Sequence, residues 1–227
     1  VAAIEALAGD PAIAAIVVRL DTPGGSVLAA DQIWRAIRRA RRRKPVIASM
    51  GAVAASGGYY VASACDEIWA DPSTVTGSIG VWFGKVDFLP VLRHFGGDAE
   101  VMGRGAHAGA ESLWRPFTPD ERATLARLVR IWYRDFLARV AEGRSMTLRE
   151  VDAVARGRIW TGDQALEIGL VDRLGGFHSA LQRARQVGGL GDDAPFEVRP
   201  GRPSTLLDYV LGETGLGQQR RRQLLRP

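Results

Sequence analysis

Ser56 is the residue of this sequence best suited to act as a nucleophile. It follows a run of small residues, Gly51 to Ala55, and precedes Gly57 and Gly58. The pattern predicts a buried strand that leads into these small residues and a helix that begins at Gly57. A serine on such a sharp turn exposes its hydroxyl, and the backbone N–H groups beside it can stabilise a negatively charged oxygen. For this segment alone, a serine that caps a helix in a close-packed turn is an equally open interpretation.

A second glycine-rich turn, Asp21–Ser26 with the sequence DTPGGS, occupies the same kind of place. It follows a continuous apolar run, which is typical of a strand buried on both faces. Ligands of open α/β sheets bind at the carboxyl ends of the strands. A glycine there lets a backbone N–H approach a substrate carbonyl without obstruction. Gly25 and Gly57 could therefore together supply the two donors of an oxyanion hole.

The first half of the chain is predicted to alternate strands and helices. The hydrophobic periodicity predicts strands over 13–20, 46–50 and 67–70, and helices over 1–8, 27–43 and 57–64. Strands joined through helices require right-handed crossovers and a sheet covered on both faces. The predicted fold class is α/β, with a mainly parallel sheet and flanking helices.

The second half is predicted to be richer in helix. We expect strands over 77–83 and 99–102, a loop over 103–116, and helices over 90–95, 118–142, 147–155, 162–168 and 176–187. Trp132 and Phe136, on the long helix, are expected to pack in the hydrophobic core. Tyr59 and Tyr60 are expected to pack in the core, or else to flank the substrate. From Gly188 the composition loosens, so we divide the chain into a domain over 1–187 and a C-terminal extension over 188–227.

The composition is that of a globular protein. Of 227 residues, 46% are apolar and 24% are charged, and a chain of this length buries about 70% of its unfolded surface. Its one cysteine, Cys65, excludes an internal disulfide framework. No apolar run approaches the roughly 20 residues that span a bilayer. Metal-ligand spacing, phosphate-binding loops and nucleotide fingerprints are absent from the sequence, so neither a metal nor a cofactor is expected.

Basic residues gather in two runs, Arg38–Lys44 and Arg220–Arg222, within a net charge of +5. An anionic partner, nucleic acid or lipid headgroups, is one interpretation. We favour another, in which the first run ends a helix and the second is a solvated tail, because no aromatic residues alternate with the arginines. A nucleic-acid partner is therefore not expected.

Five blocks, in one order along the chain, carry a resemblance to a known family. They are Asp21–Ser26, Ala54–Tyr60, Asp71–Gly80, Gly157–Ala165 and Gly169–Asp172. Together they resemble the signal peptide peptidase SppA and its relatives, serine peptidases with the Clp-protease/crotonase fold. The resemblance covers roughly residues 1–187 and implies a long helix after the active-site loop. It also implies that Ser56 is the nucleophile, that Gly25 and Gly57 form the oxyanion hole, and that a lysine is the general base, without a cofactor.

The implied lysine is absent from its expected position. In single-domain members it lies in a Gly-Ala-His-Lys stretch after the nucleophile, where this chain has Gly105–Ala108 and therefore Ala108. A lysine base needs a pKa lowered by burial. Lys44 closes an Arg-rich helix and Lys85 lies in no similar motif, so neither is a credible substitute. His107 is the more tempting substitute, but next to position 108 on an extended backbone its side chain should point the other way, and His94 and His178 are weaker candidates.

The long form of the family, with two copies of the domain in tandem, offers an account of this absence. The resemblance implies that in this long form the lysine lies in the first copy and the serine in the second. The present sequence looks like the second copy, without the expected first strand. We expect an N-terminal domain outside this sequence to supply the base, and the isolated chain to be inactive or weak. The resemblance further implies a homo-oligomer, an N-terminal membrane anchor outside this sequence, and a place at the bacterial cytoplasmic membrane with the catalytic part on the periplasmic side.

The expected function is a serine endopeptidase that cleaves apolar peptides, such as the remnants of cleaved signal peptides. Two alternatives stay open. A crotonase-type acyl-CoA enzyme would hold a thioester carbonyl between the same two N–H groups, and a catalytically degenerate half would serve assembly alone. Labelling by a fluorophosphonate separates the first alternative from a peptidase, and Ser56→Ala in the intact protein separates the second.

Overall fold

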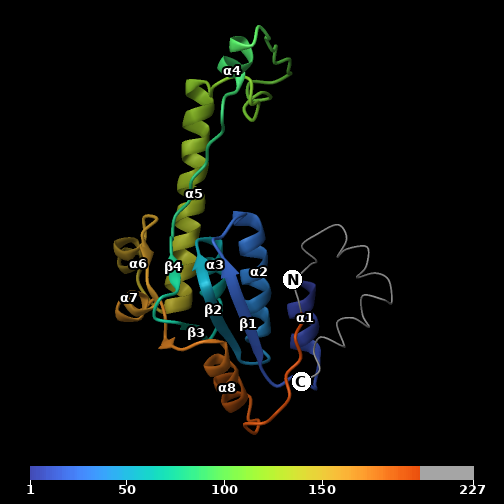
Figure 1. Ribbon diagram of the computed structural model, residues 1–227, viewed down its shortest axis with the longest axis vertical. Coiled ribbons are helices and arrows are strands. Elements are labelled where there is room, and N and C mark those ends of the chain that lie inside the picture. Colours follow the sequence, from blue (N-terminus) through green and yellow to red (C-terminus); the bar gives the residue numbers. More distant parts are fainter. Residues whose placement is uncertain (200–227) are drawn as a thin grey trace, which may run out of the picture.

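A six-stranded sheet organises the computed structural model, which describes residues 1–199 (Figure 1). The strands are β1 (Ile16–Thr22), β2 (Val46–Ala55), β3 (Glu67–Ala70), β4 (Val75–Gly77), β5 (Ile159–Trp160) and β6 (Arg173–Leu174). The helices are α1 (Ala2–Gly9), α2 (Val27–Ala40), α3 (Gly57–Ala62), α4 (Leu89–His94), α5 (Pro119–Arg144), α6 (Leu148–Val154), α7 (Gly162–Glu167) and α8 (Phe177–Val187). All strand pairings within these residues are parallel except that of β4 with β5. The predicted α/β class with a mainly parallel sheet is confirmed.

β2 is the central strand and leads directly to Ser56. One edge of β2 pairs with β1, and its other edge pairs first with β3 and then with β4. The strand extends beyond the predicted range of 46–50 because the small residues 53–55 continue the pairing, with Thr22 on one side and β4 on the other. The other edge of β1 has no strand partner in the part of the chain that the structure describes.

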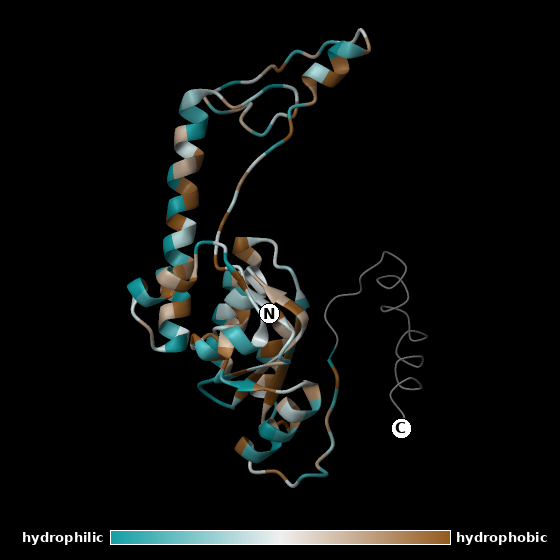
Figure 2. Ribbon diagram, turned by 60° about the vertical axis from the view of Figure 1, so that its left-hand side comes forward, coloured by the Kyte–Doolittle hydropathy of each residue, from teal (hydrophilic) through white to brown (hydrophobic). Residues whose placement is uncertain are grey.

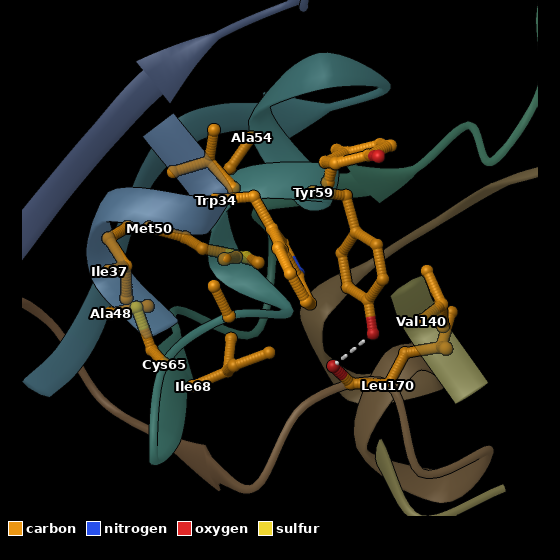
Figure 3. Close-up of a cluster of buried hydrophobic side chains, with 14 of the residues drawn as sticks. Trp34, Ile37, Ala48, Met50, Ala54, Tyr59, Cys65, Ile68, Val140 and Leu170 are labelled. Atoms are coloured by element: carbon orange, nitrogen blue, oxygen red, sulfur yellow. Dashed lines mark hydrogen bonds between the residues drawn. The ribbon is translucent and has the colours of Figure 1, made fainter. Parts of the chain in front are cut away.

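Both faces of the sheet are buried. Alternate residues of β2 point to opposite faces, so Ala48 and Met50 join the larger core while Ile47 packs with the residues of α8. Figure 3 shows the larger core, in which the Tyr59 hydroxyl donates to the Leu170 carbonyl at 2.8 Å. Tyr59 is therefore a core residue, as the sequence predicts.

The first basic run fastens neighbouring elements together. α2 ends at Ala40 rather than at residue 43. In its last turn, Arg39 pairs with Glu5 of α1 at 2.5 Å, and just after the helix Arg41 pairs with Asp66 at 2.7 Å. Lys44 donates to two carbonyl groups at the end of α1, those of residues 7 and 10. These cations are used inside the molecule, which agrees with the interpretation of this run as a helix end. The second run, Arg220–Arg222, lies outside the described residues.

Residues 80–118, which we call the arm, extend away from the sheet and its helices, which we call the body (Figure 1). α4 is the one helix of the arm, and α5 leads from its far end back to the body. The predicted strands over 77–83 and 99–102 are wrong, since β4 ends at Gly77 and residues 99–102 have no regular structure. Within residues 1–199, neither segment has a neighbouring strand to pair with. Figure 2 shows hydrophobic stretches along this arm.

The two-residue strands β5 and β6 were not predicted, because so short a segment carries no periodicity. The predicted C-terminal extension begins with residues 188–199, which contain no helix or strand and lie beside α1 and β1. The remainder of the extension lies outside the described residues, so the domain boundary at residue 187 stays a prediction.

Candidate active site

Ser56 lies at the junction of β2 and α3 in a strained conformation. Its φ of 52° and ψ of −117° are unusual for any residue other than glycine. Strain of this kind costs about 1–3 kcal/mol and persists only where the surrounding structure enforces it. The Ser56 N–H donates to the Gly77 carbonyl at 2.9 Å, whereas the Ser56 side chain makes no capping hydrogen bond. The Ser56 side chain is half-buried, and its hydroxyl is not used to cap the helix.

The turn after β1 lies directly against Ser56. Gly24 has a φ of 110°, and its N–H donates to the Thr22 hydroxyl at 3.2 Å. A Cβ at Gly24 would lie 2.7 Å from the Gly57 nitrogen and 2.7 Å from the Cβ of Ser56. No side chain fits there, so the close approach of the two turns requires glycine at position 24.

The backbone N–H groups of Gly25 and Gly57 lie beside each other at this contact. A Cβ on Gly57 would be 3.3 Å from the Gly25 nitrogen. Among residues 1–199, neither of these N–H groups has a hydrogen-bond acceptor. Two free donors next to a serine hydroxyl are the arrangement that stabilises the oxyanion of an acyl-transfer intermediate. The structure thus brings together the three residues that the sequence singled out.

The small residues on both sides of Ser56 allow β1 to approach β2 and α3 closely. A Cβ on Gly51 would lie 2.5 Å from the side chain of Asp21, and one on Gly58 would lie 2.9 Å from that of Thr22. Asp21 accepts a hydrogen bond from the Val53 N–H at 3.1 Å, where the pairing of the two strands shifts register. The run of small residues is therefore a packing requirement that sets the two turns side by side.

A narrow apolar cavity opens beside Ser56. It has a volume of about 20 Å³, and Gly25, Ser56 and Gly57 form one part of its wall. The rest of the wall comes from α2, α3, α5 and the start of the arm: Val27, Ala30, Tyr60, Gly80, Val81, Trp132 and Phe136. Phe136 is buried in the core as predicted, whereas Trp132 is half-buried and faces the cavity.

Neither lysine of the chain is placed as a base for Ser56. Lys44 donates to carbonyl groups at the end of α1, at the opposite end of β2 from Ser56. Lys85 lies in the arm, where its ammonium donates to the carbonyls of Ala110 and Ser112 at 2.8 and 2.7 Å and lies 4.4 Å from the ring centre of Phe117. Both ammonium groups have structural partners.

The histidines and Ala108 are also distant from the cavity. His107 pairs with Asp120 at 3.4 Å where the arm meets α5, and His94 ends α4. His178 lies in α8, on the face of the sheet away from the larger core. Ala108 belongs to the turns over residues 104–111, at the far end of the arm in Figure 1. None of these residues lines the cavity beside Ser56.

A carboxylate that the sequence did not single out lies behind the cavity. Asp31 of α2 accepts a hydrogen bond from the Tyr60 hydroxyl at 3.0 Å and pairs with Arg35 at 2.6 Å and Arg139 at 3.4 Å. Partial burial acts to raise the pKa of Asp31, but the Arg35 and Tyr60 hydrogen bonds outweigh it and lower that pKa below its ordinary value. Burial is the main cause that raises the pKa of Tyr60 to about 12, and the neighbouring Asp31 carboxylate raises it further in the same direction. No sequence motif marks this pair, because helix packing alone brings it together.

No group of three His, Cys, Asp or Glu side chains within residues 1–199 is arranged to hold a metal ion. In the same part of the chain, we find no helix with the length and apolar character needed to cross a membrane.

Comparison with known proteins identifies a family. The sequence profile of peptidase family S49 matches residues 38–190. The chain is 39% identical to a chloroplastic serine protease SPPA of Arabidopsis thaliana over 88% of its length, and 37% identical to protease 4 of Salmonella typhi over 78%. A protein of Synechocystis sp. that is named as a protease is 38% identical over 79% of the chain.

These relatives are longer than the present chain. The match covers 30% of the Arabidopsis protein, 29% of the Salmonella protein and 65% of the Synechocystis protein. The segment matched by the family profile, residues 38–190, contains β2, α3 and the long helix α5.

Proposed function

The chain belongs to peptidase family S49, the family of SppA and protease 4, and from this premise we propose that it is a serine endopeptidase with Ser56 as the nucleophile. The Ser56 Oγ attacks the carbonyl carbon of a peptide bond while its proton passes to a lysine amine. The N–H groups of Gly25 and Gly57 hold the resulting oxyanion. The C–N bond then breaks, the amine leaves with that proton, and water hydrolyses the acyl ester to restore Ser56.

One observation carries this proposal: the two glycine turns meet at Ser56, and neither N–H group has an acceptor among residues 1–199. A Cβ on Gly24 would collide with Gly57 and Ser56, so the contact between the turns is specific to the residues present. A serine that served only as a helix cap would direct its oxygen to a backbone N–H of α3, and the Ser56 side chain makes no such bond.

We propose that the general base comes from a lysine of another domain. The ammonium groups of Lys44 and Lys85 are bound to backbone carbonyls in other places. Ala108 stands where the family resemblance expects a lysine, and the arm carries this position away from Ser56 (Figure 1). Because the arm extends away from its own body, a lysine at this position of a related domain would reach the active site of a neighbouring domain rather than its own.

The arm also supports a proposed partner, a second domain of the same family in a homo-oligomer or a tandem chain. Its apolar side chains are largely exposed, among them Trp82 at 87%, Phe95 at 80% and Met102 at 87%. Exposed apolar surface of this extent is typical of a protein interface or a membrane contact.

The bacterial cytoplasmic membrane, with an anchor outside this sequence and the catalytic part on the periplasmic side, is the proposed site of action, and its support is the resemblance alone.

The proposed substrates are apolar peptides such as remnants of signal peptides. The cavity beside Ser56 is lined by Val27, Ala30, Trp132 and Phe136 and is small. It therefore suits a short apolar side chain next to the cleaved bond.

Labelling with a fluorophosphonate tests the nucleophile. We expect the full-length gene product to be labelled at Ser56 and to cleave apolar peptides, and Ser56→Ala to abolish both. The 227-residue chain alone should cleave far more slowly, because it lacks the base. A crotonase-type acyl-CoA enzyme would not be labelled, and a purely structural half would leave proteolysis unchanged by Ser56→Ala.

A further inference from the structure

Three helices that border the cavity meet at the carboxylate of Asp31. The residue lies in the second turn of α2, the helix that starts just after Gly25. Its Oδ1 accepts the hydrogen bond from Tyr60 of α3, and Arg139 of α5 lies 3.4 Å from the same oxygen. One carboxylate thus links the helix behind the Gly25 turn, the helix behind Ser56 and the helix that leads to the arm.

Tyr60 is well placed to transmit this link to Ser56. It lies one helical turn after Ser56, and its N–H donates to the Ser56 carbonyl at 2.8 Å. The Tyr60 ring also lines the cavity and contacts Phe136, with ring centres 4.8 Å apart. Because α3 has only six residues, a restraint at Tyr60 restrains the whole helix.

The hydrogen bond between Tyr60 and Asp31 helps to hold the backbone at Ser56 in its strained conformation. Ser56 is strained, with a φ of 52°, and α3 has no side-chain cap to fix its start. The distance between the Gly25 and Gly57 N–H groups depends on how α2 and α3 are packed. The Tyr60–Asp31 hydrogen bond is a direct polar connection between those two helices, close to both N–H groups.

The same cluster is braced from α5. The Arg139 guanidinium lies 4.3 Å from the ring centre of Trp34, a buried residue of α2. Arg35 holds the other carboxylate oxygen of Asp31 at 2.6 Å. The carboxylate is therefore fixed from α2 and from α5, and within the described residues Tyr60 is the partner that connects it to α3.

We propose that Asp31, acting through Tyr60, is a positioning residue that sets the spacing of Ser56 and the Gly25 N–H for catalysis. This inference rests on the proposed function of Ser56. Neither side chain touches the reacting atoms. The link fixes geometry, so its loss should lower kcat and leave KM nearly unchanged, because substrate binding in the cavity is retained.

The test uses Tyr60→Phe in the full-length gene product, with Tyr133→Phe as the matched control. Tyr133 donates to Asp152 at 2.7 Å, a tyrosine–aspartate bond between α5 and α6 that is outside the cavity. We expect Tyr60→Phe to lower kcat and the rate of fluorophosphonate labelling by about 10- to 100-fold, a range typical of small misplacements of reacting groups. Tyr133→Phe should lose comparable thermal stability and keep kcat within twofold.

Substitutions at Asp31 sharpen the result. Asp31→Asn keeps an acceptor for the Tyr60 hydroxyl and should retain most of kcat, whereas Asp31→Ala should match Tyr60→Phe. The double variant Asp31→Ala/Tyr60→Phe should be no slower than either single one, because both remove the same link. Equal kcat values for Tyr60→Phe and Tyr133→Phe would overturn the inference. Full activity in Ser56→Ala would instead overturn the proposed function, and the two failures are therefore distinguishable.

Discussion

The body and the arm differ in the burial of their apolar side chains. In the body, Ile47, Met50 and Tyr59 are completely buried. Between Ile79 and Phe136, a stretch that contains the whole arm, the one buried residue is the charged Glu121. The body is thus ordered by its own hydrophobic core, whereas the arm is shaped by local polar links such as those of Lys85 and Glu121.

This contrast separates two roles. A close-packed body can hold two turns and a strained serine in fixed contact, because packed interiors resist small displacements. An arm without a core of its own is expected to have low local stability, and its exposed apolar side chains are available for contact with another domain. Each of the following experiments compares a residue or a condition between the two regions.

The largest effect is expected from crowding the contact between the glycine turns. Gly24→Ala places a Cβ 2.7 Å from the Gly57 nitrogen and 2.7 Å from the Cβ of Ser56, so the turns must separate. We expect kcat of the full-length gene product to fall by about 100- to 1,000-fold, the effect of losing one oxyanion-hole donor. Gly96→Ala in the arm is the control, since Gly96 has a similar left-handed φ of 78° and nothing within 4 Å of an added Cβ. Equal activity of the two variants would contradict the site geometry.

Core and arm should differ in their contribution to stability. Ile47→Val removes one buried methylene group from β2, and we expect a loss of about 0.5–1.5 kcal/mol in the free energy of unfolding. Trp82→Ala removes a much larger side chain that is 87% exposed, and the expected change is within about 0.5 kcal/mol. Urea titration of the 227-residue chain measures both. A larger loss from Trp82→Ala would show that the arm has a core of its own.

Acid should loosen the arm where it joins α5. Hydrogen bonds from the Arg115 side chain, which has the larger effect, and from the Thr118 N–H lower the pKa of Glu121 from 4.5 to about 2. A depressed pKa in the folded state means that this stabilisation is complete above about pH 4.5 and is lost as the pH falls toward 2. Pepsin should therefore cut near residues 115–121 increasingly as the pH is lowered through this window. Glu121→Gln should be cut to a similar extent throughout it; an unchanged pH dependence in that variant would assign the loosening to another group.

The smallest effect is expected at Lys85. Lys85→Met removes the ammonium that binds the carbonyls of Ala110 and Ser112. Hydrogen exchange should accelerate over residues 85–117 and remain unchanged in β2, because the body does not depend on this link. Faster exchange in β2 as well would mean that the two regions unfold together.

The elements of the body could be predicted because their signals are local. Continuous apolar runs mark β1, β2 and β3, and helical spacing marks α2 and α5. The same rules failed at residues 77–83 and 99–102, where apolar residues predicted strands. A strand needs a neighbour that accepts its hydrogen bonds, and the sequence of one segment does not reveal whether that neighbour exists.

The sequence by itself determined that Ser56, Gly25 and Gly57, the proposed nucleophile and its proposed N–H donors, would meet. They follow two buried strands, and parallel strands bring their carboxyl ends to one edge of the sheet. The sequence also determined that no lysine follows Ser56 in the expected motif. Only the tertiary structure decided that Lys44 and Lys85 are occupied by backbone carbonyls, that Trp132 faces the cavity, and that Asp31 and Tyr60 connect α2 to α3. These contacts depend on how helices distant in sequence pack against one another, which is a property of the whole fold rather than of any local pattern.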